Sequence, residues 1–207
     1  MQERSDGNLS LNLLVKREPY LYSAYVNKKE LITYLEKIDS ALSDHTTLHI
    51  YGSGACMLLD EPDRTSLDLD IAGPYSDADA VDLRHAADAA GLPVNPPDSY
   101  QGNHIEWIGA LRLCLQPPTK GQTILLWQGK NLNIVTAYIP ALVASKLIRY
   151  DEIDQSDIRY LLSQGHFPFS DIQDAVRCLP SQFAGDHIVQ DNLINLKTDM
   201  QIWETIT

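Results

Sequence analysis

The sequence predicts an α+β fold in which a small mixed β-sheet is flanked by helices and followed by a helical C-terminal tail. Through the first two-thirds of the chain, short apolar runs bounded by glycine, proline or polar turns alternate with amphipathic helical patterns. After Tyr138, apolar residues recur at helical spacing. We therefore expect an α/β core over residues 1–138 and a helical part over residues 139–207 packed on that core.

Composition places the chain among ordinary globular proteins. It has 207 residues, of which 44% are hydrophobic and 21% charged, a size that suits one domain with a helical annex. The net charge of −12 argues against a broad nucleic-acid-binding surface, because phosphate binding needs clustered Lys and Arg. The apolar runs are shorter than the roughly 20 residues of a membrane span. We expect a cytoplasmic protein with no membrane partner, and its three widely spaced cysteines fit a reducing compartment.

Residues 48–71 are the stretch most informative about function, and the elements expected up to residue 72 include it. Helical spacing of apolar residues predicts the first helix, with Asn27 as its N-cap. Alternating or continuous apolar residues predict the strands. In order, we expect a strand over residues 9–15, a helix over 28–43, a strand over 48–51, a helix over 54–59, a polar loop over 61–66 and a strand over 67–72.

Cap and turn residues define the later elements. Ser76 is the expected N-cap of a helix that ends at Gly91, and residues 92–102 form a proline-rich loop. Strands are expected over residues 111–115, 123–128 and 132–137, the last two joined by a hairpin at residues 129–131. In the tail we expect one helix to begin at Pro140, a second to be capped by Asp154 or Ser156, a third by Ser170, and a fourth to begin at Asp186.

The predicted strand over residues 67–72 carries two carboxylates on one face. Alternate side chains of a strand share a face, so Asp68 and Asp70 point together while Leu67, Leu69 and Ile71 point to the core. Neighbouring carboxylates repel each other unless a cation lies between them. A hard divalent ion with oxygen ligands is the natural occupant, which makes this pair a candidate metal site.

Gly52 and Ser53 follow a strand and open a helix. Free N–H groups and a partial positive charge at a helix N-terminus suit a phosphate, so these residues are a candidate phosphate site. A plain strand-to-helix turn would use the same residues. The six histidines show no ligand spacing, and the sequence predicts no zinc site.

Two blocks of the sequence share their spacing with one known family. The first holds Gly52-Ser53 and, after a spacer, residues 64–70 (RTSLDLD), an R-x-S-x-D-apolar-D pattern. The second opens on residues 142–147 (LVASKL) and continues through Arg149, Asp154 and Asp157. Together they resemble the polymerase-beta-type nucleotidyltransferase superfamily, in the minimal bacterial branch that includes the toxins of abortive-infection-type toxin–antitoxin pairs.

The resemblance implies a site and a reaction. By analogy, Asp68 and Asp70 hold Mg²⁺, Gly52 and Ser53 bind the triphosphate of an NTP, and the enzyme moves a nucleoside monophosphate onto a hydroxyl and releases pyrophosphate. Arg64, Ser66 and Lys146 are then expected near the nucleotide, Lys146 close to its phosphates. The acceptor implied is an RNA 3′ end such as that of a tRNA, a protein or a small molecule, and an antitoxin protein is an implied partner.

The sequence departs from this family pattern at the third carboxylate. Members usually carry it on a later strand, but residues 132–137 offer Asn133 and Thr136 and no acid. Three alternatives remain open: Glu106 substitutes, the substrate supplies its own base, or catalysis has been lost. The last would leave a nucleotide-binding or partner-binding module. Lys146 on a mostly apolar helix face is either aimed at a site or extends its charge to the surface.

Overall fold

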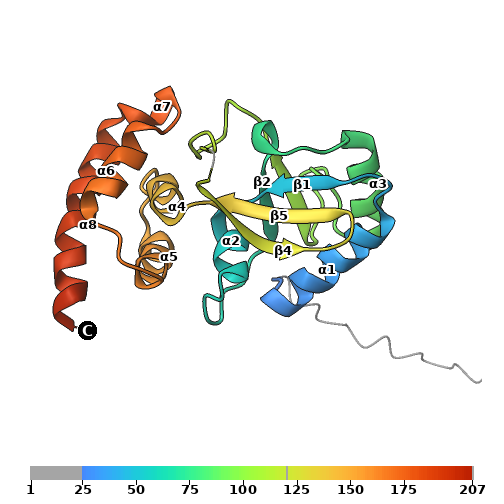
Figure 1. The fold of residues 1–207 in the computed structure, drawn as a ribbon, viewed down its shortest axis with the longest axis horizontal. Coiled ribbons are helices and arrows are strands. Elements are labelled where there is room, and N and C mark those ends of the chain that lie inside the picture. The colour runs from blue at the N-terminus through green and yellow to red at the C-terminus, as the bar shows by residue number, and fades with distance from the viewer. Residues whose placement is uncertain (1–24, 120, 207) are drawn as a thin grey trace, which may run out of the picture.

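The described part of the chain is a mixed α and β structure with five strands and surrounding helices (Figure 1). It is a computed structural model and describes residues 25–119 and 121–206, so the strand predicted over residues 9–15 lies outside it. The α+β prediction is confirmed. The elements are α1 (Lys28–Ala41), β1 (Thr46–His49), α2 (Gly52–Leu58), β2 (Asp68–Ala72), η1 (Gly73–Tyr75), α3 (Ala80–Ala90), β3 (His104–Ile108), β4 (Thr123–Gln128), β5 (Leu132–Ala137), α4 (Ile139–Lys146), α5 (Glu152–Ser163), α6 (Phe169–Arg177), α7 (Ser181–Ala184) and α8 (His187–Ile206).

The strands form one three-stranded and one two-stranded ladder, which are joined by a bridge. In one, β5 lies between β1, to which it is parallel, and β4, to which it is antiparallel. In the other, β2 and β3 are parallel. An antiparallel bridge between Ile50 and Ile71, with Tyr51 N–H donating to the Asp70 carbonyl at 3.2 Å, joins β2 to the end of β1. The strands β2 and β3 therefore continue the small mixed sheet beyond β1.

Helix α1 begins where its cap predicts. The Asn27 side chain accepts the N–H of Glu30, and the Glu30 side chain accepts the N–H of Asn27, which makes a capping box. Its apolar face, with Leu31, Leu35 and Ile38 buried, packs against α3 and β5. The predicted hairpin between β4 and β5 is also confirmed.

The helices after β5 cover one end of the sheet (Figure 1). Helix α4 follows β5 directly and is almost wholly buried, because α6 and α5 pack on it. Buried apolar residues from Val26 to Leu196 form one continuous cluster, so the helical part shares the core of the sheet. Among the described helices, none is long and apolar enough to cross a membrane.

The strand predicted over residues 111–115 is wrong. Those residues form turns, in which the N–H groups of Arg112 and Leu113 donate to the Gly109 carbonyl, and Leu111 is 93% exposed. The apolar alternation instead serves a loop that buries Leu113 and Leu115. The strand that pairs with β2 is β3, which the prediction missed.

Several predicted caps are also wrong. Ser76 accepts the His49 N–H and donates to the Ala72 carbonyl, which ties η1 to the sheet, and Asp79 caps α3 instead. Helix α5 is capped by Asp151 rather than Asp154 or Ser156, because the earlier acid already accepts two backbone N–H groups. Helix α6 begins at Phe169, with Pro168 at its N-cap position, so the predicted cap Ser170 lies inside the first turn.

Candidate functional site

Four polar side chains form a two-by-two array where β2 and β3 pair. The register places Asp68 opposite His104 and Asp70 opposite Glu106. Alternate residues of a strand share a face, so all four project from the same side of this ladder. We call this set, Asp68, Asp70, His104 and Glu106, the β2–β3 site.

The strand alternation that predicted the carboxylate pair holds within β2. Leu69 and Ile71 are buried, while Asp68 and Asp70 are partly exposed. Leu67 does not point to the core as expected and is 39% exposed. It lies between β2 and Ser66, which forms an antiparallel bridge with Val26, just before α1.

Three groups of the site have the spacing of metal ligands. One ligand atom each of Asp68, His104 and Glu106 lies within 4.8 Å of the others. Carboxylate oxygens and a neutral imidazole nitrogen are common ligands of divalent cations. These residues therefore fit a divalent ion. The register of β3 also brings a further carboxylate, that of Glu106, beside Asp68 and Asp70.

Asp70 is the most strongly perturbed acid of the β2–β3 site. Burial, together with the charges of Asp68 and Glu106, raises the pKa of Asp70 from 3.8 to about 7. Without a cation, its ionised form is unfavourable at neutral pH. A bound divalent ion would compensate for this charge.

Helix α2 begins beside this carboxylate. Gly52 has a left-handed backbone, with φ of 62°, and a Cβ at this position would overlap Asp70 Oδ2. Only glycine meets both demands without strain. Gly52 therefore lets the chain turn into α2, which begins two residues earlier than predicted, in direct contact with the candidate metal site.

Ser66 lies beside Asp68. Its Oγ donates to Asp68 Oδ1 at 2.9 Å. Its backbone is fixed in turn by an antiparallel bridge to Val26, just before α1. Ser66 therefore positions one of the two carboxylates of β2.

Arg64 and Ser53 are in contact at the start of α2. A guanidinium nitrogen of Arg64 donates to Ser53 Oγ, and another ion-pairs with Asp157 at 3.0 Å. The carboxylates that Arg64 pairs with are those of Asp157 and, at 3.8 Å, Glu61.

Lys146 is buried in the same group of charges. It is 8% exposed and pairs with Asp157 and with Asp154, the latter at 3.4 Å. Arg149 binds Asp154 from the solvent side through two hydrogen bonds of 2.8 and 3.0 Å. We call Glu61, Arg64, Lys146, Asp154 and Asp157 the ion-pair cluster; it joins α4 and α5 to the loop before β2.

The ion-pair cluster also contains a set of possible metal ligands. Atoms of Cys56, Glu61 and Asp157 lie within 4.8 Å of one another. Burial and the nearby charge of Asp157 raise the pKa of Glu61 to about 7. Two cations, Arg64 and Lys146, already lie among these acids, and Lys146 alone is paired with two of the cluster's carboxylates.

His104 was not recognised from the sequence. The signal available was the His-x-Glu spacing of residues 104–106, which matches the Asp-x-Asp spacing of β2. Its meaning depends on the pairing of β3 with β2, which no local pattern specifies.

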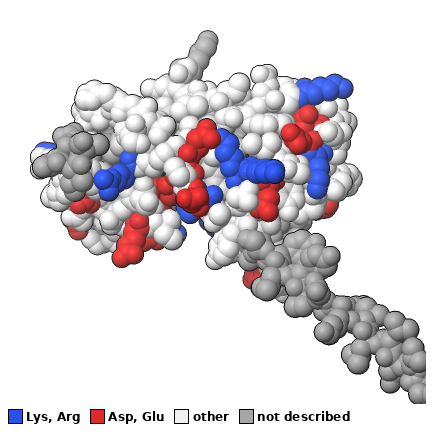
Figure 2. All heavy atoms as spheres, turned by 90° about the horizontal axis from the view of Figure 1, so that it is seen from below, with Lys and Arg blue, Asp and Glu red and all other residues white. Residues whose placement is uncertain are grey.

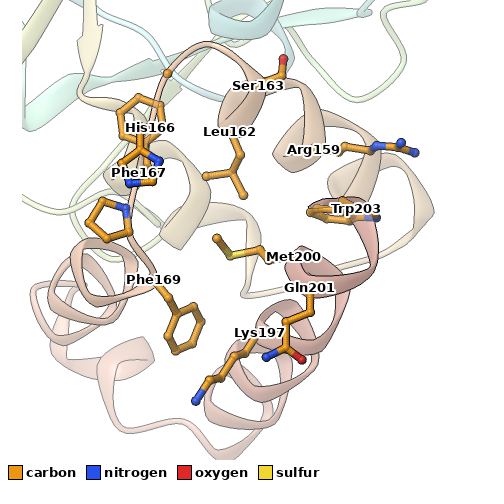
Figure 3. A pocket seen from close by; sticks show the side chains of 12 residues that line it. Arg159, Leu162, Ser163, His166, Phe167, Phe169, Lys197, Met200, Gln201 and Trp203 are labelled. Carbon is orange, nitrogen blue, oxygen red and sulfur yellow. The ribbon is translucent and has the colours of Figure 1, made fainter. Parts of the chain in front are cut away.

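A separate cavity of about 560 Å³ lies in the helical part and shares no residue with the β2–β3 site. Figure 3 shows Leu162 and Met200 within it, with Phe169 and Lys197 at one side. The Lys197 ammonium lies 5.6 Å from the centre of the Phe169 ring. On the face drawn in Figure 2, Lys and Arg side chains lie among Asp and Glu rather than in a separate basic patch.

The chain was compared with protein-family models, with curated proteins and with solved structures, and none of the three comparisons gave a match.

Proposed function

We propose that the protein is a metal-dependent nucleotidyltransferase that moves a nucleoside monophosphate from an NTP to an acceptor hydroxyl. The observation that carries the proposal is the register of β3 on β2, which brings Glu106 opposite Asp70 and beside Asp68. A third carboxylate is the group that the sequence pattern lacked. Its presence supports the nucleotidyltransferase-like form of the α+β fold over a module without turnover.

Each residue has a role in this proposal. Asp68 and Asp70 would hold Mg²⁺, which supplies charge neutralisation to the triphosphate. Ser66 keeps Asp68 oriented through its hydrogen bond. One carboxylate oxygen of Glu106 would accept the proton of the attacking hydroxyl, whose oxygen bonds to the α-phosphorus as the bond to pyrophosphate breaks.

The phosphate contacts involve the residues around α2. Gly52 and Ser53 would meet the triphosphate at the start of α2, beside Asp70. Arg64 already contacts Ser53 and can reach a phosphate bound there. Lys146 would approach the phosphates only by giving up part of its pairing with Asp157.

The acceptor is an RNA 3′ end such as that of a tRNA, a protein side chain or a small molecule. The net charge of −12 favours an acceptor that touches the protein over a small area. As part of the same proposal, an antitoxin-like protein would control the enzyme.

A second candidate is a nucleotide-binding or partner-binding module without turnover. One observation favours it: Arg64 and Lys146, the cations that the transfer would use, are both paired with buried Asp157. Under this alternative the ion-pair cluster is a permanent structural element, and a bound nucleotide is never cleaved.

Thermal unfolding with each NTP and Mg²⁺, followed by assay of pyrophosphate release with labelled NTP and total RNA or lysate, tests the proposal. A nucleotide at 100 times its Kd should stabilise the protein by about 2.7 kcal/mol, or roughly 5–10 °C in Tm. Label should then appear on an acceptor. Asp68→Asn with Asp70→Asn should abolish both effects while the fold remains.

The matched control is Asp171→Asn with Asp174→Asn, which removes two exposed acids of α6. This variant should behave as the wild type. Stabilisation without pyrophosphate release from any acceptor would support the module. Full activity in the Asp68/Asp70 variant would overturn the metal assignment and the proposed function with it.

A further inference from the structure

We propose that His104 is a ligand of the metal site and that the site selects Mn²⁺ over Mg²⁺. The inference rests on the metal site of the proposed function and adds to it the identity of the ion. It follows from the arrangement of β3 on β2, since His104 and Glu106 share a face and His104 lies opposite Asp68.

The ligand spacing suits one ion shared by three side chains. The ligand atoms of Asp68, His104 and Glu106 lie within 4.8 Å of one another. Ligands bound at about 2.1 Å from an ion lie roughly 3–4 Å apart, so small rotations of these partly exposed side chains would close the site. Both carboxylates and the imidazole come from paired strands, which hold their backbones in place.

The imidazole of His104 is oriented with one nitrogen left for a ligand. Its Nδ1 lies 3.1 Å from the Gly102 carbonyl oxygen. A carbonyl oxygen only accepts, so Nδ1 carries the proton and Nε2 of the neutral ring presents a lone pair. A hydrogen bond from the other ring nitrogen to a backbone carbonyl is the usual support of a metal-binding histidine. The ring of Tyr100 packs edge-on against His104, with centroids 6.3 Å apart.

The partners of the two carboxylates leave room for a cation. Asp68 accepts one hydrogen bond from Ser66, a neutral group. Glu106 pairs at 3.3 Å with Arg112, whose side chain is 73% exposed. Such an exposed pair contributes little, about 0–1 kcal/mol, and a divalent ion can displace it.

The mixed ligand set distinguishes between Mg²⁺ and Mn²⁺. Mg²⁺ takes oxygen ligands and keeps several waters, so an imidazole adds little to its binding. Mn²⁺ accepts carboxylate oxygens equally well and also binds imidazole. A site with one imidazole and two carboxylates should therefore bind Mn²⁺ more tightly than Mg²⁺.

The test uses the full chain, freed of metal with EDTA and dialysed, and the two ions alone. Mn²⁺ binding is followed by the loss of the free-ion EPR signal, and Mg²⁺ by competition. We expect the wild type to bind Mn²⁺ at least tenfold more tightly. His104→Gln should weaken Mn²⁺ binding about tenfold and change Mg²⁺ binding less than threefold. The nitrogen coupling of a bound imidazole, read by pulsed EPR, should be present in the wild type and lost in the variant.

Two further variants complete the design. His166→Gln, at an exposed histidine far along the chain, should leave Mn²⁺ binding and the nitrogen coupling unchanged. Asp68→Asn should weaken both ions. Thermal unfolding of each variant in EDTA confirms that it folds.

The outcomes separate the two proposals. Equal binding of the two ions, with no nitrogen coupling and no effect of His104→Gln, would overturn the role of His104 and leave the carboxylate site intact. Failure of the wild type to bind either ion, with or without NTP, would overturn the metal site and the proposed function together.

Discussion

Raising the pH should destabilise the metal-free protein through Asp70. The pKa of this carboxyl is 3.8 in its ordinary state and about 7 in the folded protein, because it is buried near Asp68 and Glu106. Between these values the folded protein holds one proton more than the unfolded chain, so the free energy of unfolding falls by about 1.4 kcal/mol per pH unit. The contribution is fully present below pH 3.8 and is lost as the pH rises through 7. From pH 5 to pH 8 the loss amounts to about 3 kcal/mol.

Asp70→Asn isolates this effect. Asparagine keeps the shape of the protonated carboxyl and cannot ionise, so urea unfolding in EDTA should give similar stabilities for the two proteins at pH 5. At pH 8 the variant should be the more stable by about 3 kcal/mol. Burial near Asp157 also raises the pKa of Glu61 to about 7, but both proteins share this contribution and it cancels in the difference.

A constant difference between the two proteins across this pH range would refute the reasoning, because it would mean that Asp70 does not change its charge there. Added Mn²⁺ or Mg²⁺ provides a second check. At pH 8 either ion should recover stability in the wild type, in which it compensates the Asp70 charge, and recover less in the variant.

Two other substitutions test the surroundings of the site by urea unfolding. Gly52→Ala should destabilise the protein by about 2 kcal/mol or more, since the new Cβ would overlap Asp70 Oδ2 in a left-handed turn. Asp157→Ala should destabilise it by about 3–5 kcal/mol, because it leaves buried Lys146 and half-buried Arg64 without their shared carboxylate.

Each has a matched control. Gly91 is also left-handed, with φ of 82°, but has open space where a Cβ would lie, so Gly91→Ala measures the conformational cost alone. Equal losses at Gly52 and Gly91 would contradict the contact with Asp70. Asp174 pairs with Arg177 on the surface, and Asp174→Ala should cost less than about 1 kcal/mol. A similar loss for Asp157→Ala would show that the ion-pair cluster contributes no more than a surface pair.

The elements predicted correctly depend on local information. The face shared by Asp68 and Asp70 follows from strand alternation, and the start of α1 follows from the local cap between Asn27 and Glu30. The hairpin at residues 129–131 is also set by adjacent residues. Local signals gave a wrong prediction at residues 111–115, where apolar alternation indicated a strand, while the strand β3 was missed.

The rest of the site depends on pairing between distant segments. Glu106 is a neighbour of Asp70 only through the register of β3 on β2, which are separated in the chain by the segment that holds η1 and α3. The hydrogen bond between Arg64 and Asp157 joins residues 93 positions apart. No periodicity or spacing specifies either contact, which is why the sequence left the third carboxylate open and assigned Lys146 to the nucleotide without its buried partners.

The two groups of acids near α2 differ in how their charge is neutralised, and this difference supports the β2–β3 site as the proposed cation site. In the ion-pair cluster, the cations of Arg64 and Lys146 lie among the carboxylates and pair with them. In the β2–β3 site, the cation that the structure pairs with an acid is the exposed guanidinium of Arg112. Burial of Asp70, together with the charges of Asp68 and Glu106, raises its pKa to about 7. A bound divalent ion would relieve the repulsion between these carboxylates. The acids that the chain itself neutralises least are therefore those best suited to bind such an ion.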